Sequence, residues 1–183
     1  MRRRIDEQLL IALFDLSHSE ELFELIHQNR DHFGKWLEFP HKTHTVEDAR
    51  NFITRSIHKN ASGKGFWCGI WDEHQLIGAI GLVQINWTDK TTEIGYYIAQ
   101  EYEGRGIIRR ACQEVVNYVF EDLALNRIEI RVQPENLRSR KIPESLGFAQ
   151  EGTLRQAEWF IDHFVDKVVY GLLKEEWNMG SIV

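Results

Sequence analysis

A short stretch with two glycines, residues 103–112, constrains the fold more than any other part of the chain. An apolar and aromatic run at 93–98 precedes it and has the composition of a β-strand. After it, apolar residues recur at positions 107, 108, 111, 112, 115, 116, 119, 120 and 123, which together form the broad apolar face of an amphipathic helix. The sequence therefore predicts a strand, a glycine turn and a helix in direct succession.

The glycine turn can offer main-chain N–H groups to an anion. Gly104 and Gly106 allow the backbone to approach a ligand closely, and the first turn of a helix has N–H groups without intrahelical partners. This arrangement suits a pyrophosphate. No Lys-Ser/Thr pair follows the glycines, which disfavours a nucleoside triphosphatase, and Arg109 stands where a dinucleotide-binding motif needs its third glycine. Two glycines alone would also fit an ordinary strand-to-helix turn.

Three motifs narrow the choice: Glu93-Ile94-Gly95-Tyr96, then Tyr102-Glu103-Gly104-Arg105-Gly106-Ile107, then Asn136-x-x-Ser139 followed by Leu146-Gly147-Phe148. Together they resemble the GNAT superfamily of acyl-CoA N-acyltransferases, and in particular its RimJ/RimL-like branch, which acetylates ribosomal proteins. The family pattern at the turn is Gln/Arg-x-x-Gly-x-Gly/Ala, and Glu103 and Ile108 depart from it at the two ends. We expect the Glu103 carboxylate to point away from the phosphates and Ile108 to narrow the space beside them.

The resemblance implies acetyl-CoA as the cosubstrate, and the sequence predicts no metal site. In the family the pantetheine arm lies between two splayed strands, here 93–98 and 127–132, and pairs with one of them like an added strand. A main-chain N–H near Tyr97 or Ile98 would then stabilise the oxyanion. The expected cofactor contacts are Tyr97, Ile98, Glu103, Gly104, Arg105, Gly106, Ile107, Ile108, Asn136 and Ser139. Six further cations suit a polyanionic cofactor as a group, namely Arg105, Arg109, Arg110, Arg138, Arg140 and Lys141.

Glu93 is the best candidate for the catalytic base, because relatives with a glutamate base on this strand place it in a similar Glu-Ile context. The alternative is a glutamate that only orients the end of the strand. Asn136 would bind the pantetheine, and Ser139 would contact it or protonate the leaving thiolate, although both residue types also favour helix caps. Relatives that use a tyrosine as the acid carry it where Pro143 stands here. Cys112 lies on the apolar ridge and is expected in the core.

The remaining patterns predict an α/β (α+β) fold of the GNAT type, with a mostly antiparallel mixed sheet of six to seven strands flanked by helices. Strands are expected at 9–14, 66–71, 76–86, 93–98, 127–132, 148–160 and 164–173, and helices from 17, 45, 107 and 136. The aromatic segment 29–43 is either a helical hairpin on the core or, as in the family, a wall of the acceptor site. Its candidate acceptor contacts are Trp36 and Phe39.

Composition limits the partners. With 183 residues, 43% of them hydrophobic, we expect one domain over residues 1–183. A net charge of −6 disfavours non-specific nucleic-acid binding and mildly favours amine substrates. No apolar run reaches membrane-spanning length, so we expect a cytoplasmic enzyme without membrane contact. The spacing of Cys68 and Cys112 gives neither a disulfide framework nor a zinc site. A homo-oligomer remains open.

We therefore expect an enzyme that transfers an acetyl group from acetyl-CoA to a primary amine in a ternary complex. The resemblance favours the α-amino group of a protein, such as a ribosomal protein. Two alternatives stay open: acetylation of a small amine (a polyamine, an amino acid or an antibiotic), and a non-catalytic acyl-CoA-binding module in which Glu103 and Ile108 mark lost turnover.

Overall fold

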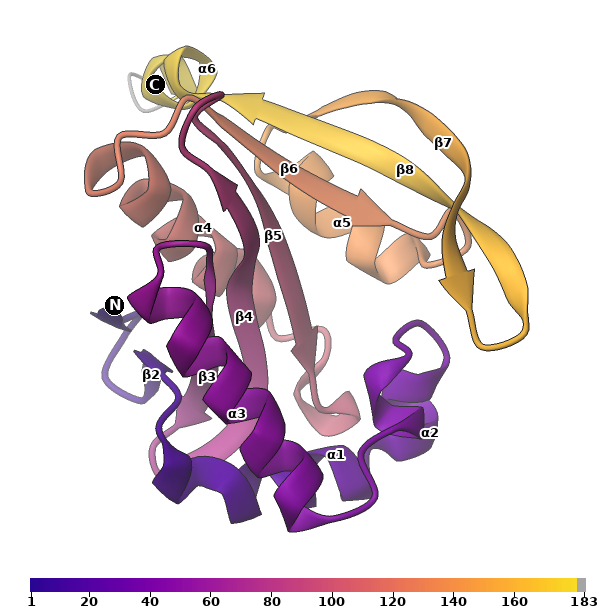
Figure 1. Cartoon of the computed structure of the whole chain (residues 1–183). Coiled ribbons are helices and arrows are strands. Elements are labelled where there is room, and N and C mark those ends of the chain that lie inside the picture. The colour runs from indigo at the N-terminus through magenta and orange to yellow at the C-terminus, as the bar shows by residue number, and fades with distance from the viewer. Residues whose placement is uncertain (181–183) are drawn as a thin grey trace.

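The computed structural model describes residues 1–180, and their strands form one eight-stranded sheet in the order β1-β2-β3-β4-β5-β6-β8-β7 (Figure 1). The strands are β1 (Arg2–Arg4), β2 (Leu9–Leu13), β3 (Phe66–Asp72), β4 (Gln75–Asn86), β5 (Thr91–Ile98), β6 (Arg127–Val132), β7 (Ala149–Phe160) and β8 (His163–Leu173). Among these neighbours only β5 and β6 run parallel. The mostly antiparallel mixed sheet is therefore confirmed. The sequence did not predict β1, because three consecutive arginines show no apolar alternation.

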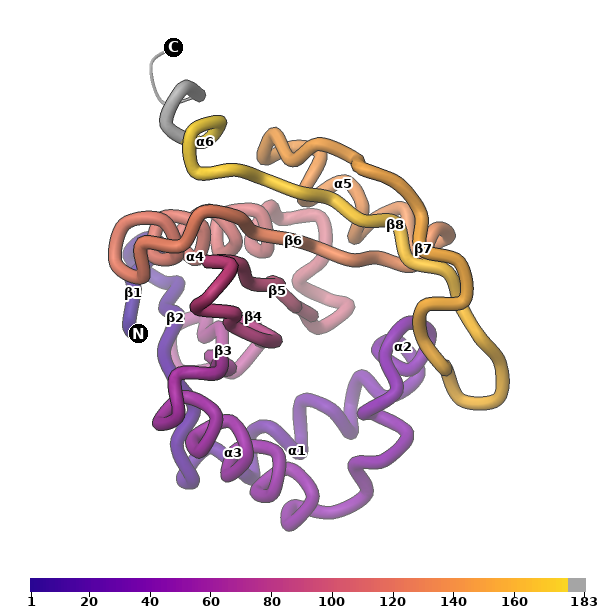
Figure 2. Tube along the Cα trace, turned by 45° about the horizontal axis from the view of Figure 1, so that its top comes forward, coloured from indigo at the N-terminus to yellow at the C-terminus, as the bar shows by residue number. Residues whose placement is uncertain are grey.

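Helices cover both faces of the sheet. They are α1 (Ser19–Gln28), α2 (Arg30–Gly34), α3 (Val46–Ala61), α4 (Ile107–Glu121), α5 (Leu137–Ser145) and α6 (Lys174–Gly180). Figure 2 shows α1 and α3 on one side of strands β3–β5 and α4 on the other. The predicted helix from residue 45 is confirmed, and it begins with a capping box in which the side chains of Thr45 and Asp48 each accept from the other's main-chain N–H. The first helix is different: Asp15 and His18 form the box on a preceding 3₁₀ turn, and α1 begins only at Ser19.

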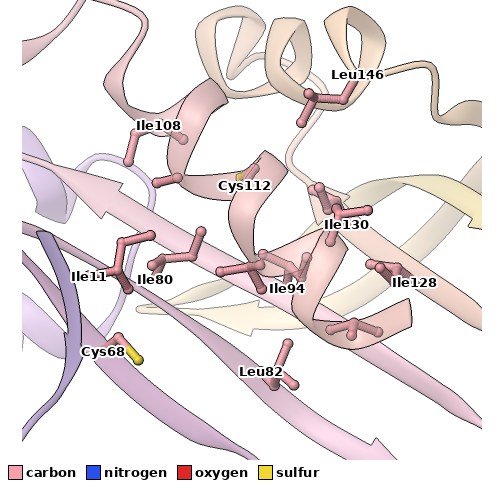
Figure 3. Close-up of a cluster of buried hydrophobic side chains, with 14 of the residues drawn as sticks. Ile11, Cys68, Ile80, Leu82, Ile94, Ile108, Cys112, Ile128, Ile130 and Leu146 are labelled. Atoms are coloured by element: carbon pink, nitrogen blue, oxygen red, sulfur yellow. The ribbon is translucent and has the colours of Figure 1, made fainter. Parts of the chain in front are cut away.

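The larger core cluster lies between the sheet and α4 (Figure 3). Ile80, Ile94 and Ile128 from three strands face the ridge of α4 that carries Cys112, and all four are at most 2% exposed. Burial raises the pKa of the Cys112 thiol, so it stays protonated. The prediction that Cys112 belongs to the core is confirmed.

The segment between α2 and α3 is not a regular helical hairpin. After the single turns of α2 and of a 3₁₀ helix at Phe39–His41, the chain is held by polar side chains. The Arg30 guanidinium donates to the carbonyls of Pro40 and Thr43, and the His41 ring lies 2.9 Å from the Gly34 carbonyl. This packing holds the segment against the sheet face that also carries α1 and α3.

Candidate active site

β5 and β6 separate part-way along their length. Their pairing covers only Thr91–Glu93 against Arg127–Glu129, whereas β5 continues to Ile98 and β6 to Val132. Both strands keep their outer neighbours, since β4 pairs with β5 as far as Ile98 and β8 pairs with β6 as far as Val132. A gap therefore opens inside the sheet directly after Glu93, and Figure 1 shows β5 and β6 diverging along their length.

The gap leaves one edge of β5 without a strand partner. The N–H of Ala99 donates to the Ile77 carbonyl of β4, and main-chain groups alternate in direction along a strand. The main chain of Tyr97 therefore also faces β4, while the main-chain groups of Tyr96 and Ile98 face the gap. The main-chain contacts expected near Tyr97 and Ile98 would therefore come from Tyr96 and Ile98, because the main chain of Tyr97 is turned toward β4. The Tyr97 ring is buried on the sheet face that carries α1 and α3, and its centroid lies 5.1 Å from that of Phe33 and 5.0 Å from that of Phe39.

The glycine turn begins α4 at the end of this gap. Gly104 and Gly106 have φ values of +75° and +70°, a conformation that favours glycine, and Gly106 is the N-cap of α4. A Cβ built on either glycine would meet no protein atom within 4 Å. The first residues of the helix contain no acidic side chain. Open space beside helix N–H groups fits a bound pyrophosphate.

Glu103, directly before the glycine turn, already has protein partners for its main chain and its side chain. Its N–H already donates to the Gln100 carbonyl at 3.2 Å, and its carboxylate accepts from the Arg138 guanidinium of α5. We therefore remove Glu103 from the expected phosphate contacts, and its negative charge is balanced by Arg138. Ile108 also differs from the expectation: it is only 8% exposed and belongs to the core cluster, so its side chain does not narrow the turn (Figure 3).

His32 of α2 also contacts the start of the glycine turn, although no motif in the sequence singled it out. Its Nε2 lies 3.4 Å from Oε1 of Glu103, and a ring N–H donates to the Ile98 carbonyl. Burial lowers the pKa of His32, and the charges of Lys35 and Arg138 lower it further. A segment far from the glycine turn in sequence thus contacts both the gap-facing edge of β5 and the start of the turn.

Glu93 lies where the gap begins, opposite Glu129. Burial raises the pKa of Glu93 above its usual value, and the carboxylates of Glu129 and Glu158 act in the same direction. Two cations oppose them, Arg131 with its Nε 3.7 Å from Glu93 Oε2, and Lys167, which pairs with Glu158 at 2.9 Å. A carboxylate with a raised pKa is suited to accept a proton near neutral pH.

Ser139 stands on the other wall of the gap, in the first turn of α5. Asn136 is the N-cap of that helix, and its Oδ1 accepts from the Ser139 N–H at 3.2 Å. Asn136 therefore does cap this helix, which is the alternative role that its residue type suggested in the sequence. The Ser139 hydroxyl and carbonyl both contact the Tyr96 hydroxyl of β5. Pro143 lies inside α5, buried.

Trp36 and Phe39 lie on the face of the sheet opposite α4. The carbonyl of Trp36 accepts from the side chain of Gln133, which is buried at the end of β6, at 3.3 Å. Phe39 packs on the Tyr97 ring of β5. The segment therefore reaches the ends of both strands that border the gap.

The flanking cations are only partly available to a cofactor. Arg110 pairs with Asp6, and Arg140 donates to the Tyr170 hydroxyl and the Pro134 carbonyl. Arg105 stacks on Tyr102, 4.8 Å from its ring centroid. In the part of the chain that the structure describes, no group of three or more His, Cys, Asp or Glu side chains could hold a metal ion. None of the helices described is long and apolar enough to cross a membrane.

A sheet opened between its two parallel strands, with helix N–H groups at the end of the opening, is the arrangement expected of a protein that binds a long thioester with a pyrophosphate. That combination defines the class of acyl-CoA-dependent acyltransferases. A sequence profile described as Acetyltransferase (GNAT) domain matches residues 8–149. The chain belongs to the GNAT acetyltransferase family and is an N-acetyltransferase that uses acetyl-CoA.

Similar proteins align with this chain over nearly its whole length. It is 37% identical over 176 residues to the putative ribosomal N-acetyltransferase YdaF of Bacillus subtilis, covering 96% of each chain. It is 29% identical to the ribosomal-protein-serine acetyltransferase of Escherichia coli, covering 91% of this chain and 93% of the other. A solved structure of the microcin C7 self-immunity acetyltransferase MccE, with acetyl-CoA and AMP, superposes with a TM-score of 0.88 at 25% identity, covering 92% and 94%. The predicted resemblance to the ribosomal-protein branch is confirmed.

Proposed function

We propose that the acceptor is the α-amino group of a protein N-terminus, with ribosomal proteins as the substrate class. The observation that carries this proposal is the 37% identity to a putative ribosomal N-acetyltransferase over 96% of the chain. A ribosomal acceptor would place the enzyme in the cytoplasm.

The environment of Glu93 supports the same choice. An α-amino group has a pKa of about 8, whereas a lysine amine has one of about 10.4. At neutral pH a larger fraction of the α-amine is already uncharged, so one carboxylate with a modestly raised pKa suffices to remove its proton. In this proposal Glu93 accepts the ammonium proton through a water molecule, and the neutral amine then attacks the thioester carbonyl.

The other groups divide the remaining tasks. The N–H groups of the turn at 104–108 hold the pyrophosphate, and the gap-facing main chain of Tyr96 and Ile98 pairs with the pantetheine. The Ile98 N–H stabilises the oxyanion of the tetrahedral intermediate. Asn136 and Ser139 contact the arm from α5, and Ser139 donates a hydrogen bond to the departing thiolate. Trp36 and Phe39 line the acceptor side.

A small amine is the second candidate, because the chain is also 29% identical over 138 residues to the spermidine N(1)-acetyltransferase of Vibrio cholerae, covering 75% of this chain and 76% of the other. The non-catalytic alternative loses its support. The charge of Glu103 is paired with Arg138 and the Ile108 side chain lies in the core, so neither departure removes a main-chain phosphate donor.

The test is CoA release from acetyl-CoA with a matched panel: peptides beginning with serine or alanine, the same peptides with a blocked N-terminus and a free lysine, spermidine, and an aminoglycoside. We expect turnover with the free N-terminal peptides and none with the blocked ones. Rapid acetylation of spermidine or the aminoglycoside, with all peptides inert, would contradict the protein acceptor and leave the acetyltransferase assignment intact. Mass spectrometry of the product identifies the acetylated nitrogen.

A further inference from the structure

The Tyr96 side chain connects the two walls of the gap. Tyr96 lies on the part of β5 that no longer pairs with β6, and its hydroxyl reaches α5. There it donates to the main-chain carbonyl of Ser139 at 2.9 Å and lies 3.2 Å from Ser139 Oγ. Since Asn136 binds the Ser139 N–H, all three polar groups of Ser139 have protein partners.

Tyr96 is suited to donate a hydrogen bond and not to give up its proton. Its ring packs against the core cluster beneath α4, and burial raises the pKa of its hydroxyl well above the ordinary value. A thiolate leaving group could not take the proton of such a phenol readily. The raised pKa disfavours proton transfer from Tyr96, whereas the two contacts with Ser139 suit it to hold that residue in place.

The two hydroxyl groups can be arranged in two ways without moving a heavy atom. In one, Tyr96 donates to the Ser139 carbonyl and Ser139 Oγ donates to Tyr96. In the other, the Tyr96 hydrogen turns to Ser139 Oγ, which frees the Ser139 hydrogen to point elsewhere. A hydroxyl has one hydrogen and two lone pairs, so Ser139 Oγ stays hydrogen-bonded to Tyr96 in both arrangements.

We propose that Tyr96 is a positioning residue for departure of the thiolate, holding Ser139 Oγ in place and becoming its donor when the Ser139 hydrogen turns to the sulfur. The inference rests on the role proposed for Ser139. As the tetrahedral intermediate collapses, the C–S bond breaks and its electron pair goes to sulfur, which accepts a hydrogen bond from Ser139. The proton that finally neutralises the thiolate comes from the attacking amine by way of water. Tyr96 and Ser139 end the cycle unchanged.

A double-mutant cycle on kcat tests this inference, with acetyl-CoA and the peptide beginning with serine as substrates. We expect Tyr96→Phe and Ser139→Ala each to lower kcat about 3- to 10-fold, the size expected for one neutral hydrogen bond. The double variant should be no slower than Ser139→Ala alone. Acetyl-CoA affinity, measured by calorimetry, should change less than about two-fold in Tyr96→Phe. Tyr118→Phe, which removes a hydroxyl from α4 away from the gap, is the matched control and should keep the full kcat.

The outcomes separate the inference from the function on which it rests. Independent, additive losses in the cycle would mean that Tyr96 only holds the two walls together, since the bond to the Ser139 carbonyl survives in Ser139→Ala. A slow Ser139→Ala enzyme beside a fully active Tyr96→Phe enzyme would overturn the inference alone. A fully active Ser139→Ala enzyme would remove the role of Ser139 and this inference with it, while the acetyltransferase activity stood. Melting temperatures of all variants exclude loss of fold as the cause.

Discussion

The Glu103 carboxylate binds the Arg138 guanidinium across the mouth of the gap, from the residue before the glycine turn to the first turn of α5. The side chain of Arg138 is 77% exposed and that of Glu103 is 21% exposed. The pair therefore lies beside the proposed phosphate site with a cation that is accessible from solvent. Phosphate oxygens and the Glu103 carboxylate would compete for the same guanidinium.

We expect Glu103→Gln to bind acetyl-CoA more tightly, by about 2- to 5-fold, because an exposed ion pair is worth up to about 1 kcal/mol. Calorimetry at low and high salt checks this, and the gain should shrink as salt screens the charges. Glu101→Gln removes a neighbouring charge and is the matched control. An equal gain in that control would show a general charge effect in place of a released Arg138.

Gly106→Glu should abolish acetyl-CoA binding, because it adds a side chain and a negative charge where the main chain is expected to meet the pyrophosphate. Gly106→Ala separates the charge from the backbone strain. The φ of +70° strains any side chain, by about 1–2 kcal/mol, but the space beyond the Cβ is open. Alanine should thus fold with a lower melting temperature and retain part of the affinity. An unchanged dissociation constant in Gly106→Glu would remove the pyrophosphate site from this turn.

Glu93→Gln should lower kcat by about 10²- to 10⁴-fold with little change in acetyl-CoA affinity. Because the pKa of Glu93 is raised, the wild-type rate should fall as the pH drops through a value above 4.5, and this acidic limb should flatten in the variant. A loss of only a few-fold would return Glu93 to a structural role.

The same pKa shift predicts a stability change. A carboxyl whose pKa is higher in the folded state binds more protons folded than unfolded, so stability falls as the pH rises through that interval. Glu93→Gln cannot ionise and should have a higher melting temperature than the wild type at pH 7, but not below pH 4. Glu129→Gln should do the opposite at pH 7, since hydrogen bonds from Arg131 and Arg127 outweigh burial and lower the pKa of Glu129. Melting curves at the two pH values test this prediction. Equal changes in melting temperature for both variants would contradict the opposite pKa shifts of Glu93 and Glu129.

Trp36→Ala should raise KM for a peptide acceptor several-fold and leave acetyl-CoA affinity intact, because Trp36 lies on the face of the sheet opposite α4. Trp87→Ala, at an exposed tryptophan after β4, is the control for loss of an aromatic surface. Steady-state kinetics with the serine peptide gives both constants. An unchanged KM would move the acceptor contact away from this segment.

Features set by a few neighbouring residues were predictable from the sequence. The helix beginning at Ile107, the positive φ positions at Gly104 and Gly106, and the strand Arg127–Val132 all agree with their local patterns. Side-chain period and the steric freedom of glycine act over a few residues, so they can be recognised without knowledge of the fold. The same holds for the capping box of Thr45 and Asp48.

Only the tertiary structure decided what each candidate residue touches. Glu93 receives its neighbours Arg131, Glu158 and Lys167 from three other strands, and the Tyr96 hydroxyl meets Ser139 43 residues further along the chain. Whether the main chain of Tyr97 or of Ile98 faces the gap depends on the register with β4, and a shift of one residue would exchange them. Strand order and register arise from packing of the whole sheet, so no local pattern contains them. The sequence by itself determined which groups could do the chemistry, and the fold determined which of them meet.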